Sequence, residues 1–239
     1  MSQSEKILVA LNKSSERVIK ELTECKVVGL GSGRTISYIL KKIKKKLKKD
    51  LVFVPSSKQI ELIASRIGLR MVSPDYINSI DLTIDGADEV DFRAYAIKGG
   101  GGALLTERLL AFISRKYIVV VDESKLSRKI GLKSRVPVEF IPSAYPLVKR
   151  VLENKKLDFV FRLDDKGYPK LSESGNYLFD VRIMHELQPE QILDELRKIP
   201  GVVDVGIFLK NEISKILVGK FNGEVVEIKG GKQAQFGLK

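Results

Sequence analysis

Three short segments of the chain carry the side chains that could do chemistry. Residues 85–91, DGADEVD, place four carboxylates within seven positions, and residues 98–107, KGGGGALLTE, place a lysine and a glutamate on either side of four glycines. Residues 29–35, GLGSGRT, combine glycines with hydroxyl and guanidinium side chains. Carboxylates can move protons, an ammonium group stabilises negative charge, and backbone amides beside glycine can surround an anion. These residue types indicate proton transfer on an anionic ligand.

The segment GLGSGRT fits a phosphate-binding turn better than a nucleotide site. It lacks the lysine of a Walker A loop, and Arg34 stands where a dinucleotide-binding motif has its third glycine. The next strand ends in Pro-Ser-Ser, without the acidic residue that would bind a ribose hydroxyl. Ser32, Gly33, Arg34 and Thr35 suit a phosphate monoester at a helix N-terminus. The alternative is a tight turn with a purely structural role.

The carboxylates of DGADEVD do not have the spacing of a calcium loop. An EF-hand loop needs acids at alternating positions and a glutamate at the twelfth, where this chain has Ala96. Asp85 and Asp88, at the end of an apolar strand, fit acid–base chemistry better. The alternative is a cluster that caps turns, which aspartate and glycine also favour.

The four consecutive glycines are costly unless backbone amides must approach a ligand. Each costs roughly 0.5–1 kcal/mol relative to alanine in regular structure. Lys98 precedes them at the end of a strand, and Glu107 follows them in the first turns of a helix. Lys125, in VDESK, ends a further strand. The alternative for the glycines is an ordinary loop.

Strands and helices alternate over the first 120 or so residues, which favours a doubly wound, mainly parallel, Rossmann-like α/β sheet. Ligands of such sheets bind beyond the carboxyl ends of the strands, where all these segments lie. After Lys125 the order becomes strand–helix–strand–strand–helix–strand, which matches a ferredoxin-like α+β unit. We therefore expect a catalytic domain at 1–126 and 207–239, with an inserted domain at 127–206. The tail should form a hairpin at Asn222-Gly223.

The net charge of +12 does not by itself indicate nucleic acid as a partner. Residues 41–49, KKIKKKLKK, hold seven lysines, and the rest of the chain has 35 basic against 30 acidic residues, a net charge of +5. Apolar side chains recur through this stretch at helical spacing, so the lysines should coat the solvent face of an amphipathic helix. The apolar positions are Ile36, Ile39, Leu40, Ile43 and Leu47.

Composition excludes several other classes. One cysteine, Cys25, and one histidine, His185, cannot assemble the usual zinc ligand sets, so we expect no metal. No apolar run is long enough to span a membrane, and the N-terminus lacks the pattern of a signal peptide. We expect a cytoplasmic protein without a membrane partner.

In this order, the motifs resemble those of ribose-5-phosphate isomerase type A. The resemblance covers residues 5–229, and DGADE followed by KGGGGAL is its most specific part. It also includes GLGSGRT, SSKQI, VDESK, VPVEF, SGNYLFD and IPGVVDVGIF. The family usually has threonine at Ser32, serine or threonine at Arg34, and often TDNGN at residues 172–176, here SESGN.

This resemblance implies an aldose–ketose isomerase that interconverts D-ribose 5-phosphate and D-ribulose 5-phosphate in the pentose phosphate pathway, as a homodimer or homotetramer. Glu107 would be the base, and Lys98 with the glycine amides would hold the oxyanion. Asp85 and Asp88 would serve ring opening and the oxygen protons. The mechanism would require no metal and no organic cofactor. The substrate-binding residues would be Ser32, Gly33, Arg34, Thr35, Gly86, Ala87, Gly99, Gly100, Gly101 and Lys125.

Three other functions use part of the same pattern. A sugar-phosphate-sensing regulator would need a DNA-binding module, and only about 25 residues precede the first strand. A nucleic-acid-binding protein would depend on the lysine segment alone, without the interleaved aromatic residues that stack on bases. A sugar-phosphate deaminase is disfavoured by DGADE followed by KGGGGAL.

Overall fold

The computed structural model describes residues 2–43, 50–183 and 187–233. The largest sheet has the strand order β15-β14-β7-β4-β1-β2-β3, and its neighbours are parallel except for the antiparallel pair β14–β15. Its strands are β1 (Val27–Leu30), β2 (Val52–Pro55), β3 (Arg70–Met71), β4 (Ile80–Asp85), β7 (Ser114–Asp122), β14 (Lys215–Gly219) and β15 (Val225–Lys229). The prediction of a mainly parallel sheet is confirmed.

Helices cover both faces of this sheet, as expected for a doubly wound fold. Helices α1 (Gln3–Glu21), α2 (Gly33–Ile43) and α3 (Lys58–Arg66) pack in one apolar cluster with β1, β2 and β4. Helix α4 (Leu104–Ile113) packs on the other face, through Leu110 and Ala111. Short 3₁₀ turns are η1 (Leu22–Glu24), η2 (Pro74–Tyr76), η3 (Glu123–Lys125) and η4 (Pro142–Ala144). No helix within the described ranges is long and apolar enough to cross a membrane.

The apolar face predicted for the lysine-rich helix is buried. The side chains of α2 that face the sheet are at most 1% exposed; they are Ile36, Ile39, Leu40 and Ile43. Lys41 and Lys42 are exposed, as the solvent-face prediction requires. The rest of that segment, residues 44–49 with Leu47, lies outside the described residues.

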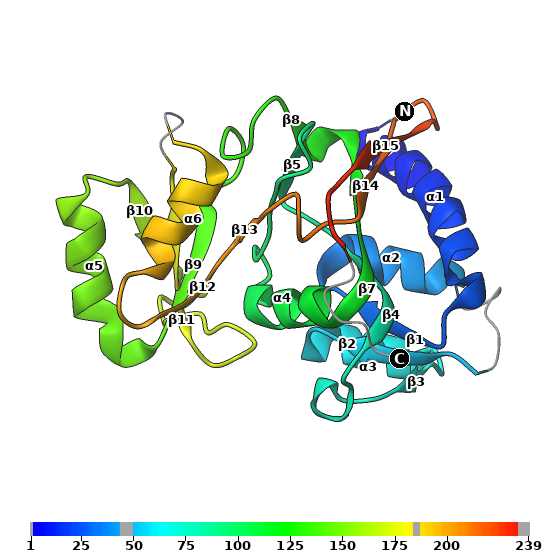
Figure 1. Ribbon diagram of the computed structural model, residues 1–239, viewed down its shortest axis with the longest axis horizontal. Coiled ribbons are helices and arrows are strands. Elements are labelled where there is room, and N and C mark those ends of the chain that lie inside the picture. Colours follow the sequence, from blue (N-terminus) through cyan, green and yellow to red (C-terminus); the bar gives the residue numbers. More distant parts are fainter. Residues whose placement is uncertain (1, 44–49, 184–186, 234–239) are drawn as a thin grey trace.

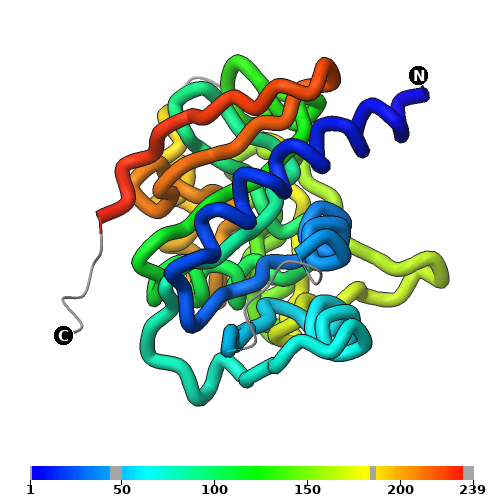
Figure 2. The backbone as a smooth tube through the Cα atoms, turned by 90° about the vertical axis from the view of Figure 1, so that its right-hand side faces the viewer, coloured from blue at the N-terminus to red at the C-terminus, as the bar shows by residue number. Residues whose placement is uncertain are grey.

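The predicted hairpin joins β14 and β15. The amide of Lys220 donates to the carbonyl oxygen of Glu224 at 2.7 Å, and Gly223 adopts φ +90° in the turn. Helix α1 runs beside this hairpin (Figure 2), so close that a Cβ added to Gly219 would lie 2.4 Å from the carbonyl oxygen of Ala10.

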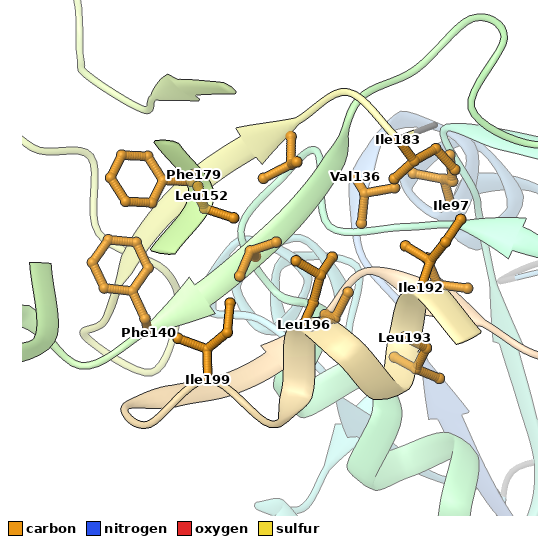
Figure 3. Close-up of a cluster of buried hydrophobic side chains, with 14 of the residues drawn as sticks. Ile97, Val136, Phe140, Leu152, Phe179, Ile183, Ile192, Leu193, Leu196 and Ile199 are labelled. Carbon is orange, nitrogen blue, oxygen red and sulfur yellow. The ribbon is translucent and has the colours of Figure 1, made fainter. Parts of the chain in front are cut away.

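A separate antiparallel sheet has the order β10-β11-β9-β12 and lies to the left of the parallel sheet in Figure 1. Its elements are β9 (Val136–Phe140), α5 (Tyr145–Asn154), β10 (Phe159–Phe161), β11 (Tyr177–Val181), α6 (Pro189–Arg197) and β12 (Val202–Val205). Chain order and strand order match the split βαβ pattern. Its core packs α6 side chains such as Leu196 against β9 and β11 (Figure 3), where the rings of Phe140 and Phe179 stack 4.8 Å apart. The α+β fold of this unit is confirmed; the bounds 127–206 stay a prediction.

A third sheet, which the sequence pattern did not predict, links the other two. Its order is β13-β6-β5-β8, built from β5 (Glu89–Asp91), β6 (Ala96–Ile97), β8 (Leu126–Ser127) and β13 (Ile207–Phe208). The strand before the glycines therefore lies outside the parallel sheet. VVDVGIF is also two strands rather than one. Gly206 lies between them, and a side chain is excluded there because a Cβ would lie 2.2 Å from the carbonyl oxygen of Lys98.

Candidate active site

The candidate site lies where the strand order of the parallel sheet reverses. From β1 the chain adds β2 and β3 on one side, then β4, β7 and β14 on the other. Loops diverge at such a point and leave a crevice at the carboxyl ends of the strands. Ser32 follows β1, and Asp85 ends β4. The two ends touch, because a Cβ on Gly31 would lie 1.7 Å from Asp85 Oδ1.

A pocket opens at this crevice, and its wall contains every predicted site residue except Asp85. Four separate stretches of chain contribute to it: the start of α2, the loop after β4, the glycine loop with α4, and η3. The lining residues are Ser32, Gly33, Arg34, Thr35, Gly86, Ala87, Asp88, Lys98, Gly99, Gly100, Gly101, Glu107 and Lys125.

Lys98 is the buried cation at the centre of the site, with a side chain only 2% exposed. Its Nζ donates to the carbonyl oxygen of Gly86 at 2.5 Å and lies 2.9 Å from Asp85 Oδ2 and 3.1 Å from Glu107 Oε2. Burial alone would lower the pKa of this ammonium, but the two carboxylates, Asp85 first, raise it above its usual value. Lys98 is therefore a cation at neutral pH.

Glu107 is a buried carboxylate in the first turn of α4, directly after the glycine loop. Its Oε1 accepts a 2.5 Å hydrogen bond from Ser32 Oγ. Its Oε2 has the Lys98 ion pair as a neighbour but accepts no hydrogen bond of good geometry. A buried carboxylate oxygen with spare acceptor capacity beside a pocket can take a proton from a ligand.

Asp85 lies behind Lys98 rather than on the wall of the pocket. Its side chain is fully buried, and its Oδ2 is 2.9 Å from both Lys98 Nζ and the Tyr117 hydroxyl, which donates to it. Its Oδ1 accepts from the amide of Gly86 at 2.7 Å. Burial first, and then the charge of Glu107, raise the pKa of Asp85 to about 7, against the opposing effects of Lys98 and Tyr117.

The carboxylates of DGADEVD divide between the site and the scaffold. Asp88 lines the pocket and accepts from the amide of Gly100 at 2.8 Å. Glu89 is fully buried and accepts from the amides of residues 131–134 at 2.8–3.2 Å. Asp91 accepts from the amides of residues 93 and 95. The turn-capping alternative is therefore correct for the second half of the motif.

The outer end of the pocket is cationic. Arg34 is exposed and Lys125 is half-buried, and both line the pocket together with Thr35. Helix α2 begins at Gly33, whose φ of +87° is favourable only for glycine. Free amides at this helix N-terminus and the two cations suit a phosphate dianion.

Sequence reasoning missed two residues that support the site. Tyr117 binds Asp85 from β7, and the only local signal is one hydroxyl in a strand that is otherwise apolar, YIVVV. Arg162, from the antiparallel-sheet unit, donates to the carbonyl oxygens of Gly99 at 2.9 Å and Gly100 at 3.3 Å, and pairs with Asp180. No local signal identifies Arg162, because it lies 63 positions from its partner Gly99.

The Lys98 ammonium group occupies the space between the two buried carboxylates, Asp85 and Glu107. A metal ion bound by Asp85 and Glu107 would have to displace Lys98 Nζ from between them. Among the described residues, no group of three or more His, Cys, Asp and Glu side chains has the arrangement of a metal site. His185 lies outside the described residues.

Comparison with known proteins shows the family of the chain. The family described as ribose 5-phosphate isomerase A (phosphoriboisomerase A) matches residues 52–223. Ribose-5-phosphate isomerase A of Prochlorococcus marinus (strain NATL1A) is 36% identical over 225 residues, 92% of this chain and 95% of that one. The solved structure of ribose 5-phosphate isomerase A from Methanocaldococcus jannaschii is 32% identical, with a TM-score of 0.84 over 92% of this chain and 98% of that chain. A D-ribose-5-phosphate isomerase solved in complex with phospho-erythronic acid is also 32% identical, with a TM-score of 0.87 over 96% of this chain and 100% of that one. The chain therefore belongs to the ribose 5-phosphate isomerase A family.

Proposed function

We propose that this chain interconverts D-ribose 5-phosphate and D-ribulose 5-phosphate, the aldose–ketose isomerisation of the non-oxidative pentose phosphate pathway. Family membership supports the reaction. The observation that supports the residue roles is the Lys98 ammonium between two buried carboxylates, at the inner end of a glycine-lined pocket with cations at its mouth.

Glu107 is the base that moves the proton between the two carbons. In the aldose-to-ketose direction it removes the proton from C2, the electrons form a C1–C2 double bond, and the carbonyl oxygen on C1 becomes an oxyanion. Glu107 then returns the proton to C1, while the hydroxyl proton on O2 passes to O1. The buried Oε2 is the oxygen available for this transfer, because Ser32 already occupies Oε1.

Lys98 and the glycine-loop amides stabilise the enediolate. Lys98 Nζ donates to Gly86 O and forms ion pairs with Asp85 and with Glu107 while Glu107 is ionised. Once Glu107 has taken the substrate proton, it is neutral and attracts the ammonium less. The ammonium can then stabilise the new negative charge on the substrate oxygen. A negative charge therefore lies next to Lys98 both before and after the proton transfer.

Asp88 handles the oxygen protons. It lines the pocket and is held by the amide of Gly100, so it lies at the substrate side of the glycine loop. We assign to it ring opening and the transfer between O1 and O2. Asp85 supports these steps from behind, through its contact with Lys98.

The phosphate binds at the N-terminus of α2. Gly33 and Thr35 in its first turn, with Arg34 and Lys125, surround the cationic mouth of the pocket. A related isomerase has been solved in complex with phospho-erythronic acid, a ligand with a phosphate and a carboxylate, which supports a site for two anionic groups. Ser32, which we expect to bind phosphate, lines the pocket and also donates to Glu107, so its role includes holding the base.

The test compares ribose 5-phosphate with free ribose, with and without a chelator. Turnover of the phosphorylated sugar should be far more efficient, because only the phosphate uses the cations and helix amides at the pocket mouth. Prolonged treatment with EDTA should leave activity unchanged. Equal kcat/KM for the two sugars would contradict the phosphate site. Loss of activity that returns with a divalent metal would contradict the role of Lys98.

We also propose that the chain acts as a cytoplasmic homodimer or homotetramer. Leu109 on α4 is 56% exposed and Leu132 is 52% exposed, and such apolar surface is commonly covered in an assembly. Sedimentation equilibrium of the purified chain would give the state directly, and a monomer at micromolar concentration would contradict the proposal.

A further inference from the structure

Tyr117 is a buried tyrosine whose hydroxyl reaches the charged centre of the site. It lies in β7 with no exposed surface, on the same face of the sheet as Val119 and Val121. Its ring stacks on Phe208 at a centroid distance of 6.0 Å. Its hydroxyl donates to Asp85 Oδ2 at 2.9 Å. A phenylalanine would fill the same apolar position, so packing alone does not account for the hydroxyl.

The hydroxyl completes the set of donors around Asp85. Oδ2 accepts from the Tyr117 hydroxyl and pairs with Lys98 Nζ, each at 2.9 Å, and Oδ1 accepts from the amide of Gly86 at 2.7 Å. Three donors from three different stretches of chain define both the orientation and the charge of the carboxylate. Because a buried carboxylate is costly without such donors, each one favours the ionised form.

We propose that Tyr117 is a positioning residue for the isomerase reaction, whose hydroxyl keeps Asp85 ionised and oriented so that Lys98 stays beside Glu107. This inference rests on the proposed function, since Lys98 and Glu107 are its catalytic groups. Tyr117 itself does not line the pocket, and it acts on the substrate only through Asp85 and Lys98.

The charges around Asp85 determine the sign of the expected effect. Lys98 faces it from the glycine loop, Glu107 from α4 and Tyr117 from β7, and the charge of Arg108 on α4 acts on Tyr117 in turn. Burial, then the nearby carboxylates, raise the pKa of Tyr117 well above its usual range, so it remains a hydrogen donor over the whole working range. Removing that donor raises the pKa of Asp85 further.

The pH dependence follows from this sign. Above its pKa Asp85 is charged and holds Lys98, and below its pKa it is neutral and Lys98 loses that partner. The wild-type chain should therefore lose activity as the pH falls through about 7, the pKa of Asp85. We call this loss of activity at low pH the acidic limb of the kcat profile. Tyr117→Phe should move the midpoint of the acidic limb to a pH about one unit higher. At pH 7 kcat should then fall about fivefold, because the wild-type carboxylate is itself only half ionised there, and it should return towards the wild-type value at high pH.

A matched control removes the same kind of bond elsewhere. Tyr95 is also buried, and its hydroxyl donates to Glu190 at 2.5 Å, away from the pocket. Tyr95→Phe should leave the acidic limb where it is. A uniform loss of kcat at every pH in Tyr117→Phe, or an unmoved limb, would overturn the proposal.

A second variant keeps the test decisive if Tyr117→Phe fails to fold. Site-specific replacement of Tyr117 by 3-fluorotyrosine retains the hydroxyl but makes it more acidic and a stronger donor. The acidic limb should then move downward, opposite to the phenylalanine variant, and movement upward or none would overturn the proposal. Inactivity of the wild-type chain on ribose 5-phosphate would instead contradict the proposed function, so the two failures are distinguishable.

Discussion

Two clusters in which a buried cation pairs with two carboxylates lie side by side at α4, yet only one opens to a pocket. The open cluster is Lys98 with Asp85 and Glu107, and the closed cluster is Arg108 with Asp204 and Glu212. In each, one buried cation pairs with two carboxylates, and in the closed cluster Arg197 also pairs with Asp204. Both buried cations lie over the ring of Phe208, at 5.4 Å for Lys98 Nζ and 4.0 Å for the Arg108 guanidinium carbon.

In the closed cluster the protein itself uses the hydrogen-bonding capacity of the cation. Arg108 Nε donates to both oxygens of Asp204 at 2.8 and 2.9 Å, and Nη1 pairs with Glu212. Nη2 donates to the carbonyl oxygens of Val205 and Ile207 at 2.7 and 2.9 Å. These contacts fasten the end of β12 and the start of β13 to α4, so the role of the closed cluster is structural.

In the open cluster, acceptor capacity is left for a ligand. Glu107 Oε2 is buried without a hydrogen bond of good geometry, and Glu107 and Lys98 both line the pocket. Buried charge therefore does not distinguish a site of chemistry from a structural ion pair in this molecule. The distinguishing feature is unused bonding capacity that faces a cavity.

The largest effect is expected when Glu107, the catalytic base of the open cluster, is replaced. Glu107→Gln keeps the shape of the side chain but cannot accept the substrate proton, so kcat should fall by roughly 10²–10⁴. Substrate binding should change much less. Steady-state kinetics and exchange of the C2 hydrogen with deuterated solvent measure both effects.

The matched control is Glu212→Gln in the closed cluster, which should retain near wild-type kcat. Near-normal exchange in the Glu107 variant would place the base elsewhere, with Asp85 the first candidate. A large loss of kcat in the Glu212 variant would remove the distinction between the two clusters.

The next largest effect is expected on stability, when Arg108 of the closed cluster is replaced. Arg108→Met leaves Asp204 buried with only Arg197 as an ionic partner, and it should lower the free energy of unfolding by about 3–5 kcal/mol. Urea denaturation measures this loss. The folded fraction should keep kcat within tenfold of wild type, because Arg108 does not line the pocket. A variant of unchanged stability would show that the closed cluster is not structural.

A smaller effect is expected when the antiparallel-sheet unit loses its contact with the glycine loop of the open cluster. Arg162→Ala removes the donors to the carbonyl oxygens of Gly99 and Gly100 and should lower kcat/KM about tenfold, because the loop amides lose their orientation. The control is Arg182→Ala, since Arg182 pairs with Asp158 on the same unit and does not contact the loop. Equal kcat/KM in both variants would show that this contact is not needed.

Much of the fold could be predicted because its signals are local. Apolar side chains at helical spacing indicated the buried face of α2, and Asn222-Gly223 indicated the β14–β15 hairpin. The third sheet could not be predicted in the same way. β6 and β13 have two residues each, too short for a periodic pattern, and their pairing joins positions 110 apart in the chain, Ile97 and Ile207.

The sequence by itself determined which residue types were available and the order in which they follow the strands. Alternating strands and helices imply a sheet with its loops at one end, and the glycine-rich motifs mark which loops approach a ligand. The tertiary structure alone decided which charges meet. Ser32 and Glu107, 75 positions apart, share a hydrogen bond. Asp88 and Glu89 are neighbours in one motif, yet Asp88 lines the pocket and the buried Glu89 accepts from backbone amides. The physical reason is range: propensity and periodicity act over a few residues, but burial, pKa and pairing depend on what the strand order brings alongside.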